Sequence, residues 1–291
     1  MTNPILITGG AGSVGRQLAS MFLEEGRRVR IFDLPFMDFT GLDEDPNVEV
    51  YKGDITDPKS VSKAAEGISG VLHLAAILPP NSEKNKEFTF KVNVDGTNNI
   101  VEAIKDSSPD ATIVFTSSIS SYGDTSGEGD PITIEQSQNA IDVYAESKIS
   151  GEKLLKESGA NFVILRIASI AVPEFLEPPE PWPFTSEQRV EMIHRDDVAD
   201  AIKNSVDSKE AVGKIFNIAG GDSWRLRGKN YVEDFFQVMG APVEMAVYRD
   251  STGWNDWYDT TESQRILSYQ NRSYSYYGDQ MKEIIRDMME E

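Results

Sequence analysis

Short apolar runs alternate with longer amphipathic stretches through the first 170 residues or so of the chain. The runs have the length and the β-branched content of strands, and the stretches between them have helical spacing. The first run, Ile5-Leu6-Ile7, is continuously apolar, as expected of a central strand buried on both faces. The alternation predicts a doubly wound parallel α/β sheet, with strands at 5–7, 28–33, 48–52, 70–76, 111–115 and 162–166.

Helices are expected between these strands, over about 13–25, 58–66, 84–105 and 140–157. Asp57 is a plausible N-cap, because proline follows it at the first helical position. The helix over 84–105 is interrupted only by Gly96. Parallel strands place their carboxyl ends, and therefore a ligand, along one edge of the sheet.

The pattern changes after Ile167. The proline-rich, acidic segment Pro173–Ser186 has no periodicity, which indicates either a loop over the site or a surface linker. A helix from His194 and a strand over 214–219 resume the earlier pattern, and the chain beyond Gly220 is helical and aromatic-rich. We therefore expect a dinucleotide-binding (Rossmann) core at 1–167 and a substrate-binding region at 168–291, with about 194–219 returning to the core.

The first strand leads into the segment Thr8-Gly-Gly-Ala-Gly-Ser-Val-Gly15, in which three of the four glycines, Gly9, Gly12 and Gly15, are spaced three residues apart. Gly9 permits a sharp turn, Gly12 lets backbone N–H groups approach a pyrophosphate, and Gly15 lets the following helix pack closely on the strand. The positive end of that helix then faces the phosphates. Glycine spacing alone is equally typical of an ordinary turn.

An acidic residue, Asp33, ends the second strand, 18 residues after Gly15. A carboxylate at this position can bind the hydroxyls of an adenosine ribose and repels a 2′-phosphate. The sequence therefore favours NAD over NADP. The nearby arginines keep NADP open as an alternative; they are Arg16, Arg27 and Arg28.

Tyr144 and Lys148 lie one turn apart on a predicted helix, so they share one face. An ammonium beside a phenol is expected to lower the phenol pKa from about 10 toward the working pH, which would make Tyr144 a general acid/base. Ser118 follows the fifth strand at the ligand edge, where it can hydrogen-bond the substrate oxygen. Taken singly, Tyr144 and Lys148 are more typical of an exposed helix face, and Ser118 is typical of a serine-rich turn.

Composition narrows the function further. The chain has 28 basic and 48 acidic residues and a net charge of −20, which argues against nucleic acid and anionic membranes as partners. It has no cysteine, so a thiol nucleophile, disulfides and thiolate-held metals are excluded. Its two histidines, His73 and His194, are too far apart for a metal motif. Without an apolar leader or a long apolar run, a cytoplasmic protein is expected.

The order of these motifs resembles the extended short-chain dehydrogenase/reductases of the NAD-dependent epimerase/dehydratase family. The resemblance covers about residues 4–220 and also rests on Gly53-Asp54, His73-Leu-Ala-Ala76, Asn93-Val-Asp-Gly-Thr97 and Asp196-Asp197. It implies bound NAD, Tyr144 as catalytic acid/base, Lys148 on the nicotinamide ribose, and Ser118 orienting the substrate. It also implies a homodimer formed through helices near 84–105 and 141–158. The cofactor-binding set expected in this way is Gly9, Gly12, Ser13, Val14, Gly15, Asp33, Asp54, Ile55, Leu74, Ala75, Ala76, Asn93 and Lys148.

Departures from the family pattern limit the types of reaction and substrate that we expect. Related dehydratases and decarboxylases carry acidic residues immediately after the position of Ser118, where this chain has Ile119 and Ser120. The segment from Ala168 to His194 is also short for gripping a nucleoside diphosphate, although Arg189, Arg225 and Arg227 remain available to an anion. We therefore expect an NAD-dependent oxidoreductase acting on a secondary alcohol or carbonyl of a small polar substrate such as a sugar. A nucleotide-sugar epimerase with retained NAD, and a regulator that binds dinucleotide without turnover, are the alternatives.

Overall fold

The computed structural model describes residues 3–126, 129–175 and 177–290 and divides the chain into two compact units. The first unit contains the chain up to Ser118, Ala140–Arg166 and Ile202–Ile215. The second contains Ile119–Asn139, Ile167–Ala201 and the chain from Phe216 onward. Each unit is therefore built from separate stretches of sequence.

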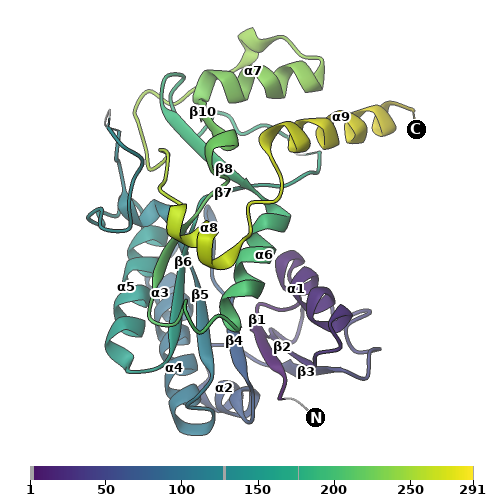
Figure 1. Ribbon diagram of the computed structural model, residues 1–291, viewed down its shortest axis with the longest axis vertical. Coiled ribbons are helices and arrows are strands. Elements are labelled where there is room, and N and C mark those ends of the chain that lie inside the picture. The colour runs from purple at the N-terminus through teal and green to yellow at the C-terminus, as the bar shows by residue number, and fades with distance from the viewer. Residues whose placement is uncertain (1–2, 127–128, 176, 291) are drawn as a thin grey trace. The chain divides into compact units, whose positions relative to one another are not determined.

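A seven-stranded sheet has its strands in the order β3-β2-β1-β4-β5-β6-β9 (Figure 1). Its strands from β3 to β6 organise the first unit, whereas most of β9 is counted in the second. β1 lies between β2 and β4 and is parallel to both, with Ile5 opposite Val29 and Gly70. This arrangement confirms the predicted Rossmann-like α/β fold. The strands are β1 (Ile5–Thr8), β2 (Val29–Asp33), β3 (Val48–Lys52), β4 (Gly70–His73), β5 (Thr112–Ser118), β6 (Phe162–Ile167) and β9 (Ile215–Ile218).

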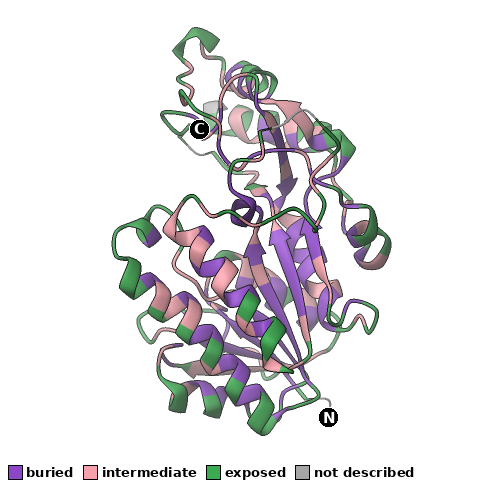
Figure 2. Cartoon of the chain, turned by 90° about the vertical axis from the view of Figure 1, so that its left-hand side faces the viewer, coloured by how far each residue is buried: buried purple, intermediate pink, exposed green. Residues whose placement is uncertain are grey.

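One face of this sheet packs against three helices through a continuous apolar core. The core joins α2 (Pro58–Ala65), α4 (Gly96–Ser107) and α5 (Val143–Ser158) to side chains such as Leu6 and Phe115. α1 (Ser13–Glu24) contacts β1 and β2. Figure 2 shows the strands coloured mainly as buried and the helices with exposed outer faces. The amphipathic spacing of the sequence therefore orients each helix correctly.

The helical region predicted over 84–105 consists of three segments. α3 (Lys86–Phe90) runs into a π-helical turn, Lys91–Asp95, and α4 begins at Gly96. A short 3₁₀ helix, Asn81–Glu83, precedes them. Asp57 caps α2 as predicted, since its carboxylate accepts hydrogen bonds from the N–H groups of Lys59 and Ser60.

The second unit has a three-stranded sheet in the order β10-β8-β7 and its own aromatic core. Trp182 and Phe184 are buried in this core, so this end of the segment Pro173–Ser186 packs inside the unit; Leu176, from the same segment, lies outside the described residues. The strands are β7 (Ser169–Ala171), β8 (Arg189–His194) and β10 (Arg225–Arg227), and the helices are α7 (Gly228–Met239), α8 (Thr261–Leu267) and α9 (Tyr274–Glu290). The unit also has 3₁₀ turns at Ile119–Tyr122, Asp222–Trp224 and Val243–Met245. α6 (Arg195–Val206) begins in this unit, and its residues from Ile202 onward belong to the first. Among the described residues, no helix is both long enough and apolar enough to cross a membrane.

Candidate active site

The glycine turn between β1 and α1 depends on backbone contacts that a side chain would block. Gly9 adopts φ +69°, and a Cβ there would lie 3.0 Å from the backbone nitrogen of Ala75. A Cβ on Gly15 would lie 2.6 Å from the Gly9 carbonyl oxygen. Gly12 is the N-cap residue of α1 and has no side chain to occupy the space beyond the helix end. The turn is therefore a backbone cradle at a helix N-terminus, which fits a pyrophosphate.

Asp33 is held beside this cradle, at the end of β2. One carboxylate oxygen accepts the Ala11 N–H at 3.0 Å, and the other accepts the Leu34 N–H at 2.8 Å. Its side chain is thereby fixed at the end of β2, where the sequence predicts binding of the adenosine ribose. The residues that fit NAD are thus present and preorganised.

The three arginines that kept NADP open all have partners inside this unit. Arg16 donates to the carbonyl oxygens of Ala11 and Thr40, each at 3.0 Å. Arg27 pairs with Asp207, and Arg28 pairs with Glu49. These contacts place Arg27 and Arg28 in structural ion pairs, which supports the preference for NAD.

The remaining predicted cofactor positions lie near the same sheet edge. Ala75, in the half-buried stretch Leu74-Ala75-Ala76 after β4, donates its N–H to the Thr8 hydroxyl at 3.2 Å. Asp54 is exposed and accepts the Thr56 N–H at 2.8 Å, whereas Ile55 is buried. Ser13 and Val14 form the first turn of α1. Their contacts to a cofactor stay a prediction.

Asn93 lies in the π-helical turn and is buried. Its amide NH₂ donates to the Ile77 carbonyl at 3.1 Å and to the Ser147 hydroxyl at 2.9 Å, and its oxygen accepts the Ile77 N–H at 2.7 Å. Ser147 precedes Lys148 on α5. Asn93 therefore connects the segment after β4 to the helix that carries Tyr144.

Lys148 and Tyr144 occur together on α5, one turn apart. The buried Lys148 Nζ donates to the Thr116 carbonyl at 2.7 Å and lies 5.5 Å from the centroid of the Tyr144 ring. It also lies 4.9 Å from the centroid of the Phe115 ring. The structure therefore brings an ammonium against the face of the phenol ring, at the end of β5 that carries Ser118.

The pKa of the Tyr144 phenol shifts opposite to the expectation from sequence. Burial, and the carboxylate of Asp142 next, raise the pKa of Tyr144 above its usual value. Burial also lowers the pKa of Lys148 to about 8, although the carboxylate of Glu152 acts in the opposite direction. Spacing could not predict this result, because desolvation favours the neutral form of both groups. In the cofactor-free protein Tyr144 is thus a protonated acid.

Sequence reasoning missed Glu83, which lies in the segment after β4. Its carboxylate accepts the Val143 N–H at 2.9 Å and the Tyr144 N–H at 3.1 Å, so it caps the first turn of α5. Asp142 also caps this helix, through the Ala145 N–H at 2.7 Å. An isolated acid 60 residues before a helix gives no local signal for such a contact.

The two histidines have structural partners. His73 is buried between the hydroxyls of Thr8 and Thr97, at 2.8 and 2.9 Å, and burial together with Lys148 lowers its pKa to about 3. His194 accepts the Asp196 N–H at 3.1 Å at the start of α6. Within the part of the chain that the structure describes, no group of histidines and acids is arranged to hold a metal.

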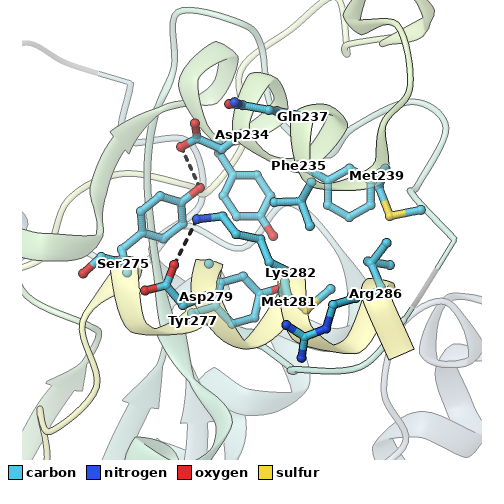
Figure 3. Close-up of a pocket in the computed structure, with 15 residues that line it drawn as sticks. Asp234, Phe235, Gln237, Met239, Ser275, Tyr277, Asp279, Met281, Lys282 and Arg286 are labelled. Atoms are coloured by element: carbon cyan, nitrogen blue, oxygen red, sulfur yellow. Dashed lines mark hydrogen bonds and ion pairs between the residues drawn. The ribbon is translucent and has the colours of Figure 1, made fainter. Parts of the chain in front are cut away.

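A large cavity of about 750 Å³ lies within the second unit, between α7 and α9. Along its lining the Tyr274 hydroxyl donates to the Asp234 carboxylate at 3.0 Å. Figure 3 shows Lys282 paired with Asp279. None of the predicted site residues lines this cavity. Arg189 and Arg225, also in this unit, lie near Asp256 and Glu191 respectively, at 3.6 and 3.3 Å.

Two curated proteins are similar to part of this chain in sequence. D-erythronate dehydrogenase of Cupriavidus necator is 33% identical over 183 residues, which cover 58% of this chain and 55% of that protein. UDP-glucose 4-epimerase of Lactobacillus helveticus is 33% identical over 176 residues, or 57% of this chain and 52% of that protein. The chain thus matches about half the length of these curated relatives.

Solved structures with the same fold cover nearly all of the chain. A short-chain dehydrogenase/reductase superfamily protein of Agrobacterium tumefaciens with bound NAD superposes with a TM-score of 0.80 at 22% identity, over 98% of both chains. UDP-glucose 4-epimerase of Thermotoga maritima, solved with UDP-glucose, gives a TM-score of 0.79 at 21% identity, over 98% of this chain and 99% of that one. At these identities the likeness concerns the fold.

The model of the NAD dependent epimerase/dehydratase family matches residues 5–180, which include the glycine turn, Asp33, Ser118, Tyr144 and Lys148. The match confirms the predicted family and NAD as the cofactor of that family. This chain is a member of the NAD-dependent epimerase/dehydratase family.

Proposed function

We propose that this protein is an NAD-dependent oxidoreductase that interconverts a secondary alcohol and its carbonyl in a small polar, sugar-like substrate. One observation carries the proposal: Lys148 contacts the ring of Tyr144 in the same unit as the glycine turn and Asp33. An acid/base pair and a dinucleotide cradle are the two parts that hydride transfer requires.

Each of the proposed site residues has a separate role in the reaction. Tyr144 donates its phenolic proton to the carbonyl oxygen, or accepts the hydroxyl proton in the reverse direction. Lys148 stabilises the negative charge that develops on the phenol oxygen, and Ser118 orients the substrate oxygen by a hydrogen bond. The glycine turn and Asp33 hold the dinucleotide. When bound, the nicotinamide supplies the carbon that accepts or releases hydride.

The type of reaction is inferred from one feature, and the small size of the substrate from another. The position after Ser118 is Ile119, fully buried and apolar, so the acid that related dehydratases and decarboxylases use there is missing. D-erythronate dehydrogenase, a relative by sequence, is named for a substrate without a nucleotide. Both features favour simple oxidation or reduction of a small molecule.

A nucleotide-sugar epimerase is the second candidate, supported by the similarity to UDP-glucose 4-epimerase. An epimerase retains its cofactor through oxidation and re-reduction, so it releases no net NADH. A third possibility, a regulator that binds dinucleotide without turnover, is disfavoured by the Tyr144–Lys148 pair. The proposal also includes a cytoplasmic location, a homodimer formed through the helices near 84–105 and 141–158, and a substrate-binding role for residues 168–291.

The test is a substrate screen. Purified protein and NAD⁺ are incubated with alcohols, sugars, sugar acids and sugar nucleotides while the absorbance of NADH is followed. NADH formation from a small alcohol, lost in Tyr144→Phe, is the expected result, because phenylalanine keeps the ring and removes the transferable proton.

Binding of NAD⁺ to the Tyr144→Phe protein is the control, since it shows that the cradle and the fold are intact. Conversion of a sugar nucleotide to its epimer without NADH release would establish the second candidate instead. Full turnover by a folded Tyr144→Phe protein would refute the assignment of Tyr144.

A further inference from the structure

A buried ionic cluster lies directly behind Lys148. The Glu152 carboxylate accepts two hydrogen bonds from the Arg166 guanidinium, at 3.0 and 2.7 Å, and a third from the Ser117 hydroxyl at 2.6 Å. The side chains of Glu152 and Arg166 are 0% and 3% exposed. Three segments of the first unit, α5, β5 and β6, therefore meet at one carboxylate.

Stability alone is a poor reason for this cluster. Burying two charges costs several kcal/mol of desolvation per ion, and apolar residues of the same volume often stabilise a fold at least as well. The position of the cluster is more informative. Glu152 is one helical turn after Lys148, and Ser117 immediately precedes Ser118. The cluster thus connects the residues that the proposed reaction uses.

We propose that Glu152 is a positioning residue that keeps the Lys148 ammonium charged and fixes α5 against the end of β5. This inference rests on the proposed function, because it assigns to Lys148 the task given above. Through Ser117, the same carboxylate sets the position of Ser118 relative to Lys148.

The charges around Lys148 support this role. His73 is neutral, because its pKa is about 3, and Tyr144 is protonated in the cofactor-free protein. Burial favours the neutral amine of Lys148, and Glu152 is the group whose charge acts against it. The guanidinium of Arg166 pairs with the carboxylate of Glu152 at 2.7 Å.

The direct experiment measures the pKa of Lys148 without any turnover. Lysine labelled with ¹³C at Cε is followed by NMR against pH in the cofactor-free protein, with Lys148→Met used to assign the signal. In Glu152→Gln we expect the Lys148 midpoint to fall by about one pH unit, from the Coulombic effect of a carboxylate one turn away. The pH above which kcat/KM decreases should fall as well.

Two further variants keep the test decisive. Glu152→Gln removes the carboxylate that Arg166 binds, so the double variant Glu152→Gln/Arg166→Gln is measured as well. A smaller fall in the Lys148 midpoint is expected there, because loss of the nearby positive charge of Arg166 offsets part of the loss of the carboxylate. Glu49→Gln is the matched control, because it breaks the ion pairs of Arg28 and Arg30 away from Lys148. It should lower stability and leave the titration of Lys148 unchanged.

An unchanged Lys148 midpoint in either folded Glu152 variant would overturn the proposal. An equal shift in Glu49→Gln would overturn it as well, because it would show a general effect of lost stability. Failure of the proposed function has a different signature, namely full turnover in Tyr144→Phe while the Lys148 midpoint still responds to Glu152.

Discussion

Gly151 offers a sharp test of whether the spacing between α5 and β5 controls activity. It lies within one turn of Lys148 on α5, and a Cβ on it would come 2.7 Å from Cζ of Phe115. Phe115 is 1% exposed and contacts Lys148, so it has no free space into which to withdraw. In Gly151→Ala, α5 must therefore move away from the sheet, and Tyr144 and Lys148 move with it.

The energetic terms of this substitution partly cancel. Overpacking a core costs about 1–3 kcal/mol, whereas alanine in a helix interior is more favourable than glycine by about 1 kcal/mol. A net loss of about 1 kcal/mol corresponds to a fall in Tm of about 2–4 °C for a chain of this size class. By contrast, a displacement of about 1 Å at a reacting group costs about 10²-fold in rate. Activity should thus fall much further than stability.

Thermal unfolding and kcat are measured on the same Gly151→Ala preparation, with NAD⁺ binding as a check of the cradle. Gly278→Ala is the matched control, since Gly278 lies within α9 and a Cβ there would meet nothing within 4 Å. The control should be equally or more stable, with unchanged kcat. A Gly151→Ala protein with wild-type kcat would refute the idea that close approach of α5 to Phe115 positions the catalytic pair.

Two further predictions concern the cofactor and the pH dependence. Asp33→Asn keeps an acceptor for the Ala11 N–H but removes the negative charge, so NAD should bind more weakly and the discrimination against NADP should decrease. Titration of the variant with both cofactors measures these affinities. Unchanged affinity for both would contradict the role of Asp33. Because the pKa of Lys148 is about 8, kcat/KM should fall above about pH 8 as the ammonium loses its proton. Arginine stays charged at high pH, so the remaining activity of Lys148→Arg should show no such decrease above pH 8.

The sheet could be predicted because its signals are local. A run such as Ile5-Leu6-Ile7 ending in glycine identifies a buried strand, and each strand in the first unit was found within a few residues. Asp57 before Pro58 likewise identified the start of α2. The π-helical turn at Lys91–Asp95 was missed, because it depends on the bonds of buried Asn93 to another segment and not on any pattern in the helix itself.

The candidate site was predictable to the extent that its residues share one element. Tyr144 and Lys148 are four residues apart on α5, so helical geometry alone brings them together. Glu83 reaches the same helix from 60 residues away, and Arg166 reaches Glu152 from β6. Such contacts depend on tertiary packing, and the spacing of residues in the sequence does not predict them.

Burial explains why the cluster around Glu152 belongs to the site and is more than a packing detail. Desolvation raises the pKa of Tyr144 and lowers that of Lys148, so it drives both groups toward their neutral forms. Proton donation by Tyr144 requires a nearby positive charge to stabilise the phenolate that results. A buried lysine supplies that charge more fully at neutral pH when another fixed charge opposes its desolvation. The Glu152 carboxylate, itself held by Arg166 and Ser117, meets this requirement from one turn away on the same helix.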